Sequence, residues 1–171
     1  MPHLDAAHLA VAAALIAPLL WAAASDVLDR RIPNLSVLAV IGLYPVWALL
    51  GTAAGFISAL EAAGIGFAVG FGLYYFNIMG AGDVKLFAAA ALFVGLGHLP
   101  LYALATVLSG GAIAVVSLVA RPRRAAVMFA LRGKGDFGRG IPYGVAIAFG
   151  AVLVVWGELL DALPSSLLAG G

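Results

Sequence analysis

The sequence contains no cysteine and very little charge. Only 10% of its 171 residues are charged, whereas a soluble domain carries about 25%. The absence of cysteine excludes a disulfide framework, thiolate catalysis and a thiolate-bound metal. Hydrophobic residues make up 64% of the chain, and the mean hydropathy is +1.12. There are too few polar residues to cover a water-soluble domain, so the composition predicts a polytopic membrane protein with one membrane-embedded domain over residues 1–171.

Six apolar segments have roughly the lengths that a bilayer requires, and they predict an all-α fold with about six transmembrane helices. Their approximate ranges are 4–24, 35–50, 55–76, 84–97, 101–120 and 141–160. Proline and glycine predict the breaks between them, at 33–34, 51–55, 80–82, 98–100, 122 and 142. No basic residue precedes the first segment, which we therefore interpret as a retained helix and not a cleaved signal.

The basic residues all fall on one side of these six segments. They are Arg30, Arg31, Lys85, Arg121, Arg123, Arg124, Arg132, Lys134 and Arg139. Because basic loops stay in the cytoplasm, this side is predicted to be cytoplasmic, with the N-terminus and the C-terminus outside. The cluster at 121–139 is predicted to be a cytoplasmic basic loop, whose apolar stretch at 125–131 lies on anionic lipid. Nucleic-acid binding is not expected, because the cluster is small and adjacent to the membrane.

Two acids return to the same predicted boundary of the membrane. Asp26 ends the first segment, and Asp83 opens the fourth, directly after Gly80-Ala81-Gly82. A charge at the centre of a membrane helix costs about 2.5–3.5 kcal/mol, so such acids call for a function. Two facing carboxylates can share one proton: the ionised acid takes a proton from water, and the neutral acid protonates a carbonyl oxygen or a leaving amine. This is aspartic peptidase chemistry, and Gly80 and Gly82 would let a substrate strand approach the backbone.

Simpler interpretations of these acids exist. Asp83 is also suited to cap the fourth helix, and Asp26 to pair with Arg30 one turn later. Asp29 is the main rival of Asp26 for the first catalytic role. No metal site or cofactor is expected, since the only histidines, His3, His8 and His98, are scattered on the predicted outer side.

Three segments resemble the prepilin peptidases, also called type IV leader peptidases. Residues 77–89 (Asn-Ile-Met-Gly-Ala-Gly-Asp-Val-Lys-Leu-Phe-Ala-Ala) resemble the GxGD block of that family. Residues 25–34 (Ser-Asp-Val-Leu-Asp-Arg-Arg-Ile-Pro-Asn) resemble its other catalytic block, and residues 141–148 resemble a segment that opens the last span. Larger members have an additional N-terminal region, often with a cysteine-rich loop, linked to N-methylation. This sequence has no cysteine and begins almost at once with the first apolar segment. It therefore resembles the short, peptidase-only branch associated with tight-adherence (Flp-type) pili.

The resemblance implies that Asp26 and Asp83 are the catalytic pair, with Pro33, Asn34 and Lys85 near the site. It implies an endopeptidase of the bacterial inner membrane that removes the leader of type IV prepilins at the cytoplasmic face. The expected partner is a prepilin with a basic leader and an apolar helix, and the basic loop is a possible docking surface for that leader or for pilus assembly proteins. Two alternatives remain open: a small proton-coupled transporter, which would place such acids nearer the midplane, and an inactive scaffold of a pilus or secretion assembly.

Overall fold

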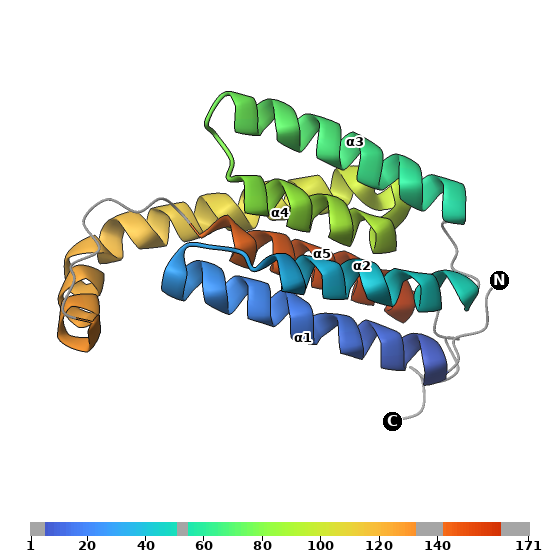
Figure 1. Ribbon diagram of the computed structural model, residues 1–171, viewed down its shortest axis with the longest axis horizontal. Helices are drawn as coiled ribbons and strands as arrows, with labels where there is room; N and C mark the ends of the chain where they lie inside the picture. Colours follow the sequence, from blue (N-terminus) through green and yellow to red (C-terminus); the bar gives the residue numbers. More distant parts are fainter. Residues whose placement is uncertain (1–5, 51–54, 133–141, 162–171) are drawn as a thin grey trace.

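The computed structural model describes residues 6–50, 55–132 and 142–161, with side chains described for all of these except 117–132. These residues form helices joined by turns, and no strand occurs among them, as predicted (Figure 1). The helices are α1 (Ala6–Asp29), α2 (Asn34–Leu49), α3 (Phe56–Tyr75), α4 (Ala81–Arg132) and α5 (Tyr143–Asp161).

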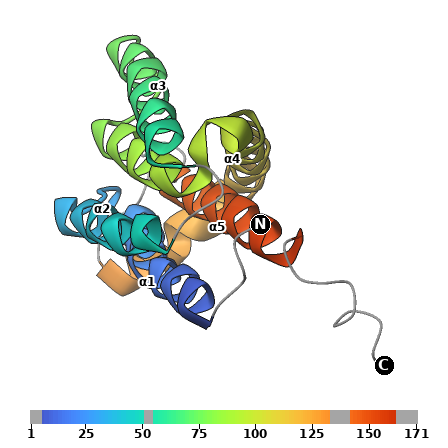
Figure 2. The same ribbon diagram turned by 90° about the vertical axis from the view of Figure 1, so that its right-hand side faces the viewer.

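Helix α4 consists of two helical parts that meet at Gly95. Gly95 has φ 70° and ψ 171°, a backbone conformation that is essentially restricted to glycine. The chain turns back at this residue, so the two parts of α4 run in opposite directions (Figures 1 and 2). The second part begins with the Leu96 N–H, which donates a 2.9 Å hydrogen bond to Ser58 Oγ of α3 and so satisfies an amide that has no partner within the helix.

Two of the predicted breaks are wrong. The break expected at 98–100 lies at Gly95, because glycine alone takes the required conformation, and Pro100 is inside the helix. The break expected at Pro122 does not occur, and the predicted basic loop 121–139 is helical as far as Arg132; its remainder, 133–139, lies outside the described residues. Proline removes one hydrogen bond without stopping a long apolar helix, as Pro18 in α1 also illustrates.

Both ends of the helix bundle are defined by contacts between helices. At one end, here called the Asp26 end, the end of α1 meets the starts of α2, α4 and α5 (Figure 1). At the opposite end, the start of α1 meets the end of α2, and the second part of α4 meets the end of α5. Helix α5 packs against both α1 and α4 (Figures 1 and 2). This arrangement brings residues 26, 83 and 144 to one end.

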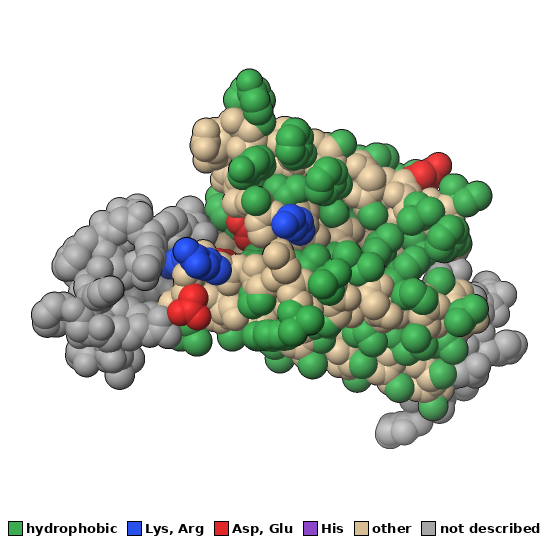
Figure 3. All heavy atoms as spheres, viewed as in Figure 1, with side chains coloured by type: hydrophobic (Ala, Val, Ile, Leu, Met, Phe, Trp, Pro, Cys, Tyr) green, Lys and Arg blue, Asp and Glu red, His purple; other side chains and the backbone are tan. Residues whose placement is uncertain are grey.

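The helices are suited to a membrane. Among the described residues, four stretches are long and apolar enough to cross it, namely Ala6–Asp29, Phe56–Tyr75, Ala81–Val116 and Tyr143–Asp161. Helix α2 is apolar but has only 16 residues. Large hydrophobic side chains such as Leu49 and Ile57 are 88% and 72% exposed, and hydrophobic side chains cover much of the described face in Figure 3. The protein is therefore a helical membrane protein, while six spans and outside termini stay predictions.

Aromatic side chains join the helices inside the bundle. Phe87 and Tyr102 stack at 4.4 Å between ring centroids and link the two parts of α4. Phe93 of α4 packs against Tyr44 and Trp47 of α2, at 5.7 and 5.8 Å. These contacts hold the first part of α4, which has Asp83 in its first turn, between α2 and the second part of α4.

Candidate active site

Asp26 lies in the last turn of α1, where its side chain is only 7% exposed. The helix ends three residues later because Arg30 adopts the left-handed conformation, with φ 55°. The Arg30 N–H donates a 3.1 Å hydrogen bond to the Asp26 carbonyl and so satisfies one of the last carbonyls of α1. The position of Asp26 in the last turn is thus set by the termination of α1 at Arg30.

The Asp26 carboxylate also binds the start of α5. The Gly144 N–H donates a buried 2.7 Å hydrogen bond to Asp26 Oδ2. Gly144 lies in the first turn of α5, where amides have no partner within the helix and the helix dipole favours negative charge. A Cβ at position 144 would lie 3.0 Å from both Cβ and Oδ2 of Asp26, so glycine is needed for this close approach.

Asp83 is held in a similar way at the start of α4. Its Oδ2 accepts a 3.1 Å hydrogen bond from the Gly80 N–H, three residues earlier. Asp83 is the third residue of α4, so its carboxylate reaches back to the residue before the helix, which is one half of a capping box. Asp83 therefore caps the helix from its third position and is not the N-cap residue considered from the sequence, and this contact coexists with any catalytic role. A Cβ at Gly80 would lie 2.8 Å from Asp83 Oδ2.

The turn before Gly80 is shaped by Asn77, whose φ is 57°. The Asn77 N–H donates to the Tyr74 carbonyl, and the Ile78 N–H to the Leu73 carbonyl, both at 2.9 Å. This is the hydrogen-bond pattern of a Schellman motif, and asparagine tolerates the left-handed conformation that the motif needs. The motif ends α3 and directs the chain toward Gly80 and the start of α4.

The turn between α1 and α2 packs directly on the start of α4. A Cβ at Gly82 would lie 3.0 Å from the Cβ of Ile32, so this glycine permits the contact. Lys85 Nζ donates a 3.4 Å hydrogen bond to Asn34 Oδ1 at the start of α2. These two contacts place the start of α4 beside the turn that follows α1.

The residues predicted from the sequence all lie at the Asp26 end. Pro33 precedes α2, and its carbonyl accepts 3.1 and 2.7 Å hydrogen bonds from the amide and the hydroxyl of Ser36. Asp29, the rival of Asp26, is exposed at the end of α1, whereas Asp26 is buried against α5. Gly144 was not among the predicted site residues, although the signal was present in the segment at 141–148.

The described histidines lie away from the two acids. His98 contacts Glu158 at 2.6 Å at the opposite end, and His8 packs edge-on against Trp47 at 5.8 Å. Over residues 6–50, 55–116 and 142–161, no three His, Asp or Glu side chains gather closely enough to hold a metal ion. His3 lies outside the described residues.

The fold and the site define a helical membrane protein with two carboxylates, each bound by a backbone amide at the start of a helix. Residues 13–115 match the type IV leader peptidase family, and the chain belongs to this family. The matched stretch contains both Asp26 and Asp83, while α5 with Gly144 follows it. No curated protein and no solved structure was found to match the chain. The family assigns the protein a peptidase function of the leader-peptidase type.

Proposed function

We propose that the protein is an aspartic endopeptidase that removes the leader of type IV, Flp-like prepilins, with Asp26 and Asp83 as its catalytic acids. The observation that carries this proposal is the juxtaposition of the two acids. They come from different helices, both lie at the Asp26 end, and each carboxylate accepts a hydrogen bond from a glycine amide. Both lie within the stretch that matches the leader peptidase family.

In the proposed reaction the two acids share one proton. The ionised acid accepts a proton from a water molecule, and the water oxygen attacks the scissile carbonyl carbon. The other acid donates its proton to the carbonyl oxygen. As the C–N bond of the tetrahedral intermediate breaks, the first acid gives the proton that it took from water to the leaving amine, and the second acid takes a proton back from a hydroxyl of the intermediate, which restores the pair. The amides of Gly80 and Gly144 occupy Oδ2 of the two carboxylates, so we assign Oδ1 of each to the water and the substrate.

The proposed substrate has a basic leader followed by an apolar helix that stays in the membrane. We place the site at the cytoplasmic face of the bacterial inner membrane, since the described basic side chains Arg30, Arg31 and Lys85 lie at the Asp26 end. Holding the substrate helix in the membrane would bring the scissile bond to the acids, which is a positioning effect. We assign to the basic segment 121–139 contact with anionic lipid or with pilus assembly proteins. N-methylation is not part of the proposal.

The test is a cleavage assay in liposomes with purified enzyme and a Flp-like prepilin. Wild type should release the leader, as seen from the mass and the new N-terminus of the product. Asp83→Asn should lose about 10²-fold or more of the rate, while Glu61→Gln, a matched change at an exposed acid of α3, should not. An inactive scaffold would insert and accumulate without cleaving any such substrate, and a wild-type enzyme with this behaviour would overturn the proposal.

A further inference from the structure

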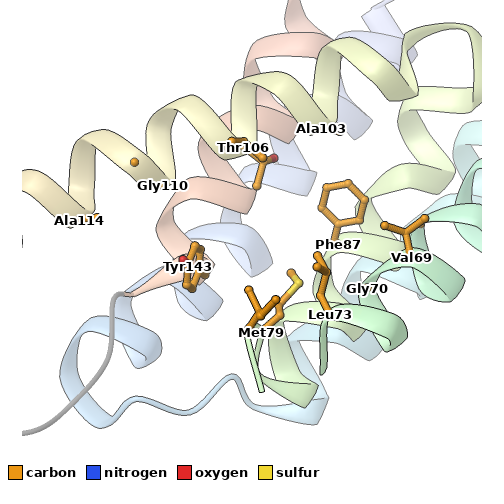
Figure 4. A pocket seen from close by; sticks show the side chains of 14 residues that line it. Val69, Gly70, Leu73, Met79, Phe87, Ala103, Thr106, Gly110, Ala114 and Tyr143 are labelled. Atoms are coloured by element: carbon orange, nitrogen blue, oxygen red, sulfur yellow. The ribbon is translucent and has the colours of Figure 1, made fainter. Parts of the chain in front are cut away.

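An apolar groove of about 410 Å³ lies between α3 and the second part of α4 (Figure 4). Val69 and Leu73 line it on the α3 side, Ala103 and Val107 line it on the α4 side, and Phe87 of the first part of α4 projects between them. Thr106 also lines the groove. A Cβ at Gly150 of α5 would lie 2.7 Å from Thr106 Oγ1, so this hydroxyl faces α5 and the groove surface is largely hydrocarbon.

One end of this groove lies beside the two acids. Met79 directly precedes Gly80, whose amide binds Asp83, and Tyr143 directly precedes Gly144, whose amide binds Asp26. Figure 4 shows Met79 and Tyr143 at the same end of the groove, away from Val69. This end of the groove therefore lies next to the two glycines whose amides bind the acids.

The walls of the groove have the direction and length of a helix-binding surface. Helix α3 and the second part of α4 both run from the opposite end toward the Asp26 end. Lining residues extend over positions 66–73 of α3 and 103–114 of α4, which is about 10 Å and about 16 Å along the helices. The groove can thus contact two to three turns of a further helix.

The α4 side of the groove also permits a further helix to approach its backbone closely. Gly111 lines the groove, and a Cβ built on it would meet nothing within 4 Å. Small residues at such positions let the backbones of membrane helices come close together. An acyl chain could fill an apolar groove as well, but an end that lies next to Gly80 and Gly144 favours a segment that is covalently joined to the scissile bond.

We propose that this groove binds the apolar helix that follows the scissile bond of the substrate, with Gly111 at the contact. The inference rests on the proposed function and adds to it the surface that positions the substrate. Tyr143 and Met79 form the junction across which the chain passes from the groove to the acids. Filling the groove should weaken binding of a helix-bearing substrate without removing either carboxylate.

Cross-linking tests the occupant directly. The chain has no cysteine, so Gly111→Cys supplies a single reactive thiol. Gly64→Cys is the matched control, an exposed glycine of α3 that does not line the groove and also has open space around it. Both are combined with Asp83→Asn, which keeps the substrate intact, and placed in liposomes with a prepilin that carries one cysteine in its apolar helix. A bis-maleimide should cross-link Gly111→Cys several times more efficiently; equal yields, or none from Gly111→Cys, would overturn the inference.

Kinetics with catalytically intact enzyme give a second test. Gly111→Leu should raise KM for the prepilin about tenfold, as expected when a hydrophobic contact is obstructed, and should change kcat much less. Gly64→Leu should leave both constants near wild type. An unchanged KM for Gly111→Leu would mean that lipid or nothing occupies the groove. Failure of the proposed function is distinct, because wild type itself would then not cleave the prepilin.

Discussion

The Asp26 carboxylate in α1 accepts a 2.7 Å hydrogen bond from the Gly144 amide in α5, across 118 residues of sequence. The contact is buried, and no side chain larger than hydrogen fits at position 144 without displacing Asp26. The same carboxylate that is assigned to catalysis therefore also fixes where the last helix begins. Asp83 has a similar but local arrangement, since its partner Gly80 is only three residues away.

Gly144→Ala should lower the rate of leader cleavage by about 10²-fold, because the new Cβ displaces the Asp26 carboxylate. Gly157→Ala is the matched control on α5, where a Cβ would meet nothing within 4 Å, and it should retain activity. The measurement is kcat/KM in liposomes, normalised to the amount of inserted enzyme. Equal activity of the two variants would show that the Gly144 contact does not position Asp26 for catalysis.

Asp26→Asn should abolish cleavage, whereas Asp29→Asn should lose far less. The reason is that Asp26 is buried and hydrogen-bonded to Gly144, while Asp29 is exposed at the end of its helix. Both changes are nearly isosteric, so insertion and accumulation, measured by immunoblotting of membranes, should be normal. If Asp29→Asn alone eliminates activity, then Asp29 replaces Asp26 in the pair.

Lys85 and Asn34 should act as one unit. Because Lys85 Nζ donates to Asn34 Oδ1, Lys85→Ala and Asn34→Ala should each reduce kcat/KM modestly, and the double variant should be little worse than either. The expected coupling is about 0.5–1.5 kcal/mol, the usual range for one hydrogen bond. A control cycle that pairs Lys85→Ala with Glu61→Gln should be additive. Additive losses in the first cycle would mean that the hydrogen bond does not support the site.

Asn77 should be important for stability through its backbone conformation. Asn77→Val should lower the free energy of unfolding by about 1–2 kcal/mol, because a β-branched residue resists the left-handed conformation at φ 57°. Asn77→Gly is the matched control and should be close to neutral, since glycine adopts this conformation freely. Equilibrium unfolding in detergent micelles measures both. Equal stability of the two variants would contradict the Schellman turn at the end of α3.

Cleavage should be insensitive to chelators and should show a bell-shaped dependence on pH. Neither acid in the proposed reaction needs a metal, and the reaction requires one acid protonated and one ionised, so activity falls on both sides of an optimum. The measurement is the rate of leader release across pH, with and without a strong chelator. Loss of cleavage on chelation that added zinc restores would contradict the aspartic mechanism and indicate a metallopeptidase.

Much of the fold could be predicted from the sequence, because helix formation in a membrane depends on local properties. Apolar length predicted α2, α3 and α5 to within two residues at each end, and the low charge indicated the protein class. The candidate site was also visible locally. Asp83 with its flanking glycines and the segment around Asp26 are turn-forming and charged, and such residues are conspicuous in a chain with little charge. The end of the fourth segment was harder, since several glycines and a proline competed for one break.

The sequence by itself determined the class of protein and the approximate helices and indicated two candidate acids, since each of these depends on neighbours along the chain. Only the tertiary structure decided that Gly144 binds Asp26, that Ile32 packs on Gly82, and that a groove between α3 and α4 ends at Met79 and Tyr143. Each of these relationships joins residues on different helices. Their geometry depends on how whole helices pack and on where α4 turns back at Gly95, and no local pattern of apolar and polar residues encodes those distances.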